Sequence, residues 1–102
     1  MEKYRYRLGY TTSEEGRKLS ELGFSNSDLF TYNVIRKGLI PCWSITRIVD
    51  ILENNGIKVS YESKNWCLKT NVIEQGLRHC FVGSSLPELV IEMLESKIVE
   101  LK

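Results

Sequence analysis

The chain has 102 residues, of which 42% are hydrophobic and 26% are charged, and its formal net charge at pH 7 is +1. These values are ordinary for a globular protein of this length, so we expect residues 1–102 to form a single domain. The near-neutral balance excludes a general electrostatic attraction to nucleic acid or to an anionic membrane.

The first element predicted by the pattern is a strand over residues 3–11. Large apolar or aromatic residues occupy alternate positions, and Arg5 and Arg7 fall between them. An alternation of period two is typical of a half-buried strand, aromatic on one side and basic on the other. A T-x-x-E capping box then predicts a helix over residues 12–22, in which Gly16 is a weak position.

The segment that follows has no clear periodicity. Residues 25–38 fit neither the helical nor the strand period, and we expect a short helix or an irregular segment that ends at Arg36 and Lys37. Residues 39–43 are expected to form a compact apolar connector because they contain Pro41.

The second half of the sequence has clearer patterns. Apolar residues recur at helical spacing after Ser44, which is placed to cap that helix, and an Asn-Asn-Gly sequence ends it. Alternating apolar and polar residues then predict strands over residues 57–62, 66–70 and 77–82. A longer loop is expected over residues 71–76.

The last predicted element is an amphipathic helix. Ser85 and Glu88 form an S-x-x-E capping box, and Pro87 falls in the first turn, where its missing N–H group costs little. The apolar stripe continues to about position 94. Residues 98–101 are interpreted as either a frayed extension or a short edge strand.

The predicted order of elements is β-α-(α)-α-β-β-β-α. We therefore expect an α+β fold with a small antiparallel sheet of three to four strands and helices packed on one face. The last five elements follow the order of a double-stranded-RNA-binding domain. Such domains use a basic cluster at the start of their last helix to contact phosphates. Here that position carries Leu86, Pro87 and Glu88, so the similar topology does not imply the activity.

Three segments carry a resemblance to known sequences: TTSEEGRKLSELGF, PCWS with the helix after it, and FVGSSLPELVIEML. They resemble a group of small uncharacterised proteins of bacteriophages and mobile elements of anaerobic gut bacteria, with motifs T-x-E-Q-x-K-K-L-x-E-L-G, P-x-W-S and G-D-T-P-x-E-A. Gly16 interrupts the first motif here, and the last motif lacks its alanine. The resemblance covers about a third of the chain and implies an intracellular accessory protein of a phage or mobile element. No activity is assigned to that group, so no residue roles carry over.

The sequence predicts neither a catalytic centre nor a cofactor. The one histidine, His79, is flanked by Cys80, and successive strand residues point to opposite faces, so the two are poorly placed to bind one zinc ion. Thiol catalysis needs a base oriented by a third group, and the sequence contains neither G-x-x-x-x-G-K nor G-x-G-x-x-G. We expect no enzymatic activity, no metal and no cofactor.

The compartment follows from the cysteines and the hydropathy. Three cysteines is an odd number, and none belongs to a C-x-x-C pair, which favours reduced thiols and a cytoplasmic location. No apolar run approaches the roughly 18 residues of a membrane-spanning helix, and MEKYRYRLGY has no apolar signal core. We expect no contact with a membrane.

These observations favour a non-catalytic protein-interaction module with an unknown protein partner. Self-association is expected through an edge strand at residues 3–10 or 98–101. Tryptophan is usually buried in a small domain, and it becomes an interface candidate when it is exposed. The candidate interaction surface consists of Arg5, Arg7, Arg36, Lys37, Trp43 and Trp66.

The alternative is a nucleic-acid-binding regulator that uses the basic N-terminal strand. Arginines beside aromatic residues can contact phosphates while the aromatic rings stack on bases. Arg5 and Arg7 are placed for this role, with Arg36 and Lys37 as further cations. This alternative is the weaker one because the alternation places the tyrosines and the arginines on opposite faces of the strand.

Overall fold

The computed structural model describes residues 9–33 and 37–101. In these ranges the chain forms three helices, a two-stranded antiparallel sheet and a three-stranded antiparallel sheet in the order β3-β4-β5, which confirms the predicted α+β fold. The elements are α1 (Ser13–Glu21), β1 (Leu29–Asn33), β2 (Gly38–Cys42), α2 (Ile45–Asn54), β3 (Lys58–Glu62), β4 (Asn65–Glu74), β5 (Leu77–Gly83) and α3 (Leu86–Ser96).

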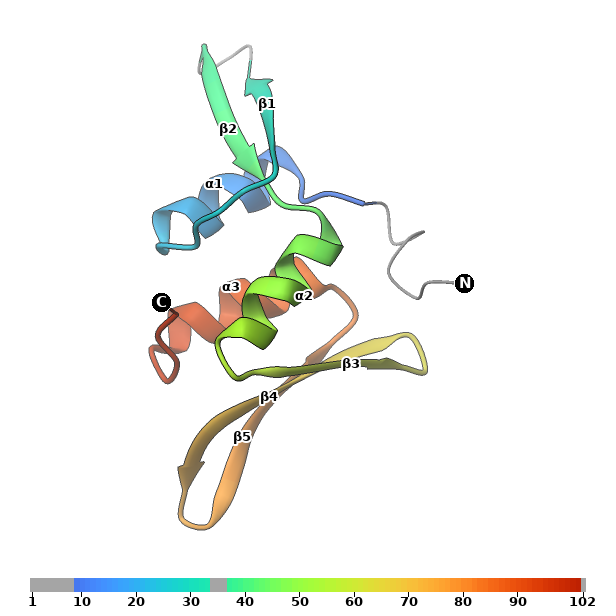
Figure 1. Cartoon of the computed structure of the whole chain (residues 1–102), viewed down its shortest axis with the longest axis vertical. Helices are drawn as coiled ribbons and strands as arrows, with labels where there is room; N and C mark the ends of the chain where they lie inside the picture. Colours follow the sequence, from blue (N-terminus) through green and yellow to red (C-terminus); the bar gives the residue numbers. More distant parts are fainter. Residues whose placement is uncertain (1–8, 34–36, 102) are drawn as a thin grey trace.

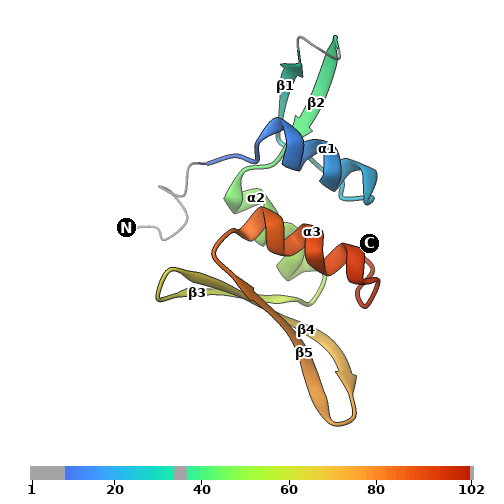
Figure 2. The ribbon, with the colours of Figure 1, turned by 180° about the vertical axis from the view of Figure 1, so that it is seen from behind.

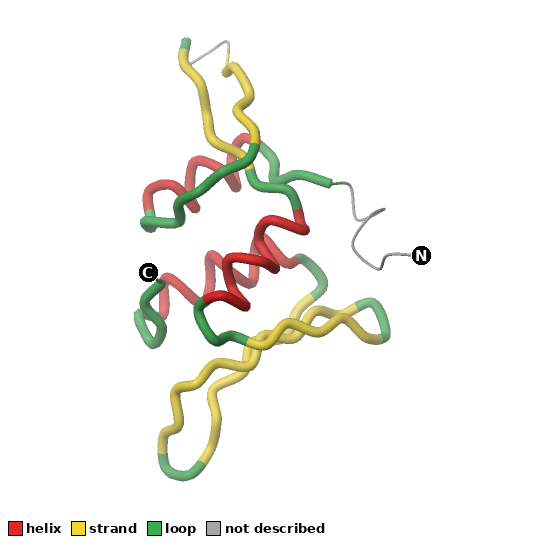
Figure 3. Tube along the Cα trace, viewed as in Figure 1, coloured by secondary structure: helices red, strands yellow, loops and turns green. Residues whose placement is uncertain are grey.

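The elements are arranged in layers. Helices α2 and α3 lie across one face of the β3-β4-β5 sheet, and α1 lies on the side of these helices away from the sheet (Figure 1). The β1–β2 hairpin projects beyond α1, and the end of the β4–β5 hairpin projects at the other end of the molecule (Figure 2). Figure 3 shows that both projections are strand pairs, with the helices between them.

The core is centred on two tryptophans. Trp43 and Trp66 are each 1% exposed. The ring of Trp43 packs edge-on against Phe24 at a centroid distance of 5.2 Å, and its Nε1–H group donates to the carbonyl oxygen of Ser25 at 2.8 Å. Trp66 packs against Tyr61 at 4.7 Å. The apolar stripes of α2 and α3 complete this core with Ile45, Ile48, Val49, Leu52, Leu86, Leu89, Val90 and Met93.

Each helix begins at the residue that the sequence predicted. The Thr12 hydroxyl accepts from Glu15 N at 3.1 Å, and the Glu15 carboxylate accepts from Thr12 N at 2.9 Å, so the capping box of α1 is complete. The Ser44 hydroxyl caps α2, and the Ser85 hydroxyl caps α3. These bonds satisfy N–H groups that the first turn of a helix leaves open.

The prediction for the segment before α2 is wrong. Residues 25–38 were expected to form a short helix or an irregular segment, and residues 39–43 a connector, but they contain the β1–β2 hairpin. Pro41 lies within β2, opposite Phe30. A proline is tolerated here because both strands of a two-stranded sheet are edge strands, so its missing N–H group can face away from the partner strand.

Strand β4 is also longer than predicted. The expected loop at residues 71–76 is strand as far as Glu74, and Gln75 and Gly76 form a tight turn with φ of 54° and 79°. A register shift lies between Lys69 and Ile73. At this irregularity the buried Thr70 hydroxyl donates to the His79 carbonyl at 3.0 Å and accepts from Val72 N at 3.2 Å.

The structure tests the edge strand expected at the C-terminal end of the chain, but it leaves the one expected at the N-terminal end largely untested. Tyr10 forms an isolated bridge with Ser44, and the rest of the strand expected at residues 3–10, apart from Gly9, lies outside the described residues. Residues 98–101 form no strand, because Val99 and Leu101 pack against the core instead. Within the described ranges, no helix combines the length and the apolar character needed to cross a membrane.

Candidate interaction surface

The outward face of the β1–β2 hairpin carries large apolar side chains. In the antiparallel register Phe30 lies opposite Pro41, and Tyr32 lies opposite Leu39. Directly opposite residues share a face, and alternate residues of one strand do too, so all four lie on one side of the hairpin. Phe30 is 55% exposed, Tyr32 60% and Leu39 67%. We call these four residues the hairpin face.

The other face of the hairpin is fixed to the body of the molecule. Ile40 and Cys42 alternate with the hairpin face and are buried. They lie on the strand that contacts α1, where Gly16 of the helix lies directly against the backbone of Pro41. The hairpin is therefore anchored through one side, and the hairpin face is directed away from this anchor.

Hydrogen bonds also hold the base of the hairpin. The carboxylate of Asp28, just before β1, accepts from Ser44 N at 2.9 Å and from the Ser44 hydroxyl at 2.7 Å. The Thr11 hydroxyl accepts from Trp43 N at 3.1 Å, and Thr11 N donates to the Trp43 carbonyl at 2.9 Å. The residue before β1 is thus bonded to the cap residue of α2, and the residue after β2 is bonded to the residue before the cap of α1.

Other exposed apolar side chains of the described residues are not gathered in this way. Ile73, Leu77 and Val82 are each more than 60% exposed. Leu77 lies opposite Glu74, whereas Ile73 lies opposite Arg78, so the two point to different faces of the β4–β5 hairpin. Isolated exposed apolar residues are normal on protein surfaces, whereas a contiguous group is more informative.

The structure separates the predicted surface residues into three groups. Trp43 and Trp66 are core residues and do not belong to any surface. Lys37 is exposed and immediately precedes β2, at the end of the hairpin. Arg5, Arg7 and Arg36 lie outside the described residues.

The residues of the hairpin face were missed by sequence reasoning. The signal that was present is the spacing of Phe30 and Tyr32 at alternate positions, with Leu39 and Pro41 at alternate positions after a turn. This spacing predicts a shared face. It does not predict that the apolar side is the exposed side, because period-two patterns usually place that side in the core.

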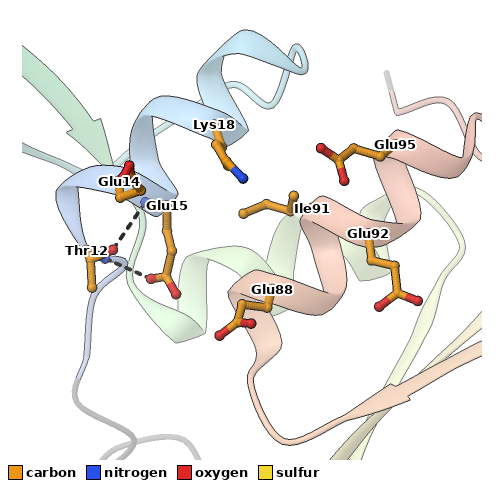
Figure 4. A pocket seen from close by; sticks show the side chains of 8 residues that line it. All are labelled: Thr12, Glu14, Glu15, Lys18, Glu88, Ile91, Glu92 and Glu95. Atoms are coloured by element: carbon orange, nitrogen blue, oxygen red, sulfur yellow. Dashed lines mark hydrogen bonds between the residues drawn. The ribbon is translucent and has the colours of Figure 1, made fainter.

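A groove lined by glutamates lies between α1 and α3 (Figure 4). Its volume is about 390 Å³, Ile91 lies between the two helices, and Lys18 extends into it (Figure 4). Glu15 is engaged in the cap of α1, and Glu14 forms an ion pair with Arg17 at 3.5 Å. The complete lining is Thr12, Glu14, Glu15, Lys18, Glu88, Ile91, Glu92 and Glu95. This groove makes the α1–α3 side of the molecule acidic.

The histidine and the thiols are dispersed. His79 Nε2 lies 3.0 Å from Glu74 Oε1, on the face of β5 opposite to the one that carries Cys80. Cys80 is exposed, Cys67 is half-buried and Cys42 is buried. In the part of the chain that the structure describes, no three His, Cys, Asp or Glu residues are grouped as metal ligands would be.

Comparison with known proteins gave no match: no family model, no curated protein and no solved structure matches the chain. The hairpin face therefore has to be interpreted from its own geometry. It combines two aromatic rings and two aliphatic side chains on a rigidly anchored projection. Aromatic side chains of this kind dominate the energetics of protein–protein contacts.

Proposed function

We propose that this chain is a non-catalytic protein-interaction module that binds a protein partner through the hairpin face. The observation that carries the proposal is the grouping of Phe30, Tyr32 and Leu39, each more than half exposed, on one side of a projecting strand pair. A projection of two strands is convex (Figure 1). The partner surface that fits it is an apolar groove.

The exposed area is sufficient for the centre of an interface. Large side chains bury roughly 150–250 Å² each, so three that are 55–67% exposed offer on the order of 300–400 Å². At about 25 cal/mol per Å², burying this area contributes roughly 9 kcal/mol of favourable binding free energy, before the cost of association is subtracted. One side of a standard interface is about 800 Å², so polar groups around the hairpin face must supply the rest.

The cellular setting of the proposal is the cytoplasm of a bacterium that carries a phage or mobile element. It is supported by the resemblance of the three segments TTSEEGRKLSELGF, PCWS and FVGSSLPELVIEML to proteins of such elements. The odd number of cysteines, without a C-x-x-C pair, agrees with a reducing compartment. In this setting the module acts as an accessory protein that binds one component of the element or of its host.

Two triple variants test the proposal. The hairpin variant carries Phe30→Thr, Tyr32→Thr and Leu39→Thr, which keep a residue of high strand propensity but remove the apolar surface. The matched control carries the same replacement at Ile73, Leu77 and Val82, which are similarly exposed on the other sheet. The buried tryptophans report through their fluorescence whether each variant is folded.

The tagged proteins are purified from the native host with and without nuclease treatment, and bound proteins are identified by mass spectrometry. We expect a stoichiometric partner with the wild-type chain and with the control variant, and its loss with the hairpin variant. A partner that the folded hairpin variant retains would overturn the proposal. Recovery that depends on nucleic acid would favour the alternative regulator that uses Arg5 and Arg7.

A further inference from the structure

The β3-β4-β5 sheet has one face that the helices do not cover. Helices α2 and α3 lie on the inner face (Figure 1). Trp66 and Leu68 of β4 are buried in the same core as the apolar residues of these helices. The alternate residues of each strand form the opposite face, and most of them are exposed. We call this opposite side the outer face of the sheet.

Three cations lie together on the outer face. Lys58 of β3 is directly opposite Lys69 of β4, and Lys69 is directly opposite Cys80 of β5. Arg78 lies two residues from Cys80 on the same face. Directly opposite Cβ atoms are about 4.5–5.5 Å apart and diagonal ones about 7–8 Å apart, so the three cations cross the sheet as one group.

No carboxylate neutralises this group within the described residues. Salt bridges in these ranges involve Arg17 and His79, and none involves the three cations. Glu62 is on the outer face but four residues from Lys58, about 13 Å along the strand. Glu74 is on the inner face and contacts His79. Two lysines directly opposite each other repel and destabilise the fold. The stability of the sheet therefore does not explain why both positions are lysine.

The charges of the molecule are separated rather than balanced locally. Helices α1 and α3 carry six carboxylates and two cations, and together they line the acidic groove. The acidic groove thus lies on α1 and α3, and the group of three cations lies on the β3-β4-β5 sheet. An anionic ligand is repelled by the acidic groove and attracted by the three cations. It therefore approaches the molecule from the outer face of the sheet.

We infer that the outer face of the sheet binds the phosphate backbone of double-stranded nucleic acid. A duplex, rather than a single strand, is favoured because the outer face of these strands carries no aromatic residue. The rings of Tyr61, Trp66 and Phe81 are all on the inner face. Single strands are usually held by bases that stack on aromatic side chains, whereas a duplex presents phosphates with its bases paired inside.

The contact is independent of base sequence, because phosphate contacts position a protein on a duplex and carry no sequence information. Ser60 and Asn65 share the outer face and can donate further hydrogen bonds to phosphate oxygens. This site is distinct from the hairpin face, so neither proposal depends on the other.

The test is fluorescence anisotropy with a labelled 20-base-pair DNA duplex of arbitrary sequence. The test variant is Lys58→Gln with Lys69→Gln, and the control is Lys18→Gln with Lys97→Gln, which removes the same charge from the helical side. Three phosphate contacts predict a slope of log affinity against log salt of about −2.7. The test variant reduces this slope by about 1.8 and weakens binding roughly tenfold or more at 50 mM salt, while the control changes little.

A folding control separates loss of binding from loss of structure. Removing the opposed lysines relieves a repulsion, so the test variant is expected to be at least as stable as the wild type toward urea. The inference is overturned if the wild-type chain does not bind the duplex at 50 mM salt, or if the two variants bind equally. It is also overturned if poly-glutamate competes as well as unlabelled duplex, because the site then recognises only negative charge.

Discussion

Replacing Gly16 by alanine is expected to destabilise the fold, although the same change stabilises most helices. In an exposed helix the gain is about 1 kcal/mol because glycine loses more backbone freedom on folding. Gly16 is buried where α1 meets β2, and a Cβ atom there would overlap the carbonyl oxygen of Pro41. A backbone oxygen cannot rotate away as the end of a flexible side chain can.

The helix must therefore move away from the hairpin. Forced shifts of this kind cost typically 1–3 kcal/mol. Because the obstructing atom is a backbone oxygen, we expect a cost in the upper part of this range, about 2–3 kcal/mol. After the gain in helix propensity is subtracted, the net loss in the free energy of unfolding is about 1–2 kcal/mol. For a domain of this size that corresponds to a decrease in Tm of roughly 5–15 °C.

Urea unfolding followed by the fluorescence of Trp43 and Trp66 measures this loss, because both rings are buried in the core. The matched control is Ser20→Ala, at an exposed position of the same helix, where a gain of a few tenths of a kcal/mol is expected. A Gly16→Ala chain that is as stable as the wild type, with an unchanged m-value, would refute the close contact between α1 and the hairpin.

Three further predictions concern the core and the thiols. Thr70→Val removes the hydroxyl that bridges two backbone groups of the β4 irregularity, so we expect a loss of about 1–3 kcal/mol in urea unfolding. Trp43→Phe removes the indole donor to Ser25 and part of the core volume, and it is expected to lose about 1–3 kcal/mol. A thiol reagent is expected to label exposed Cys80 first in the native protein, and buried Cys42 only after unfolding.

Each of these predictions has a result that contradicts it. Thr46→Val, at an exposed position of α2, is the control for Thr70→Val, and equal stability of the two variants would mean that the buried bridge contributes nothing. A Trp43→Phe chain that unfolds at the wild-type urea concentration would contradict the packing of the core. Labelling of Cys42 at the rate of Cys80 would contradict the burial of β2 against α1.

The helices were predictable because their signals are local. The caps at Thr12, Ser44 and Ser85 each involve residues within three positions of each other, so the sequence contains the whole interaction. The strands of the β3-β4-β5 sheet were predictable as far as their alternation was regular. The prediction failed after Thr70, where a buried hydroxyl allows β4 to continue through a register shift.

The β1–β2 hairpin was not predictable by the same reasoning, because the contact that positions it is not local. Pro41 suggests a break in the chain, yet its carbonyl lies against Gly16, 25 positions earlier. The contact between α1 and β2 also determines which face of the hairpin is exposed. Ile40 is buried, whereas the neighbouring Leu39 is exposed to solvent. For the same reason Gly16 is a packing requirement and not merely a weak position of its helix.

Site-specific photo-crosslinking in the native host tests the proposed function most directly. The chain carries benzoylphenylalanine in place of Tyr32 on the hairpin face, or in place of Ile73 on the β4–β5 hairpin, which has a similar exposed fraction. We expect irradiation to join one specific protein to position 32 and not to position 73. A specific adduct at position 73 alone, or none at position 32, would contradict the assignment of the hairpin face as the contact surface.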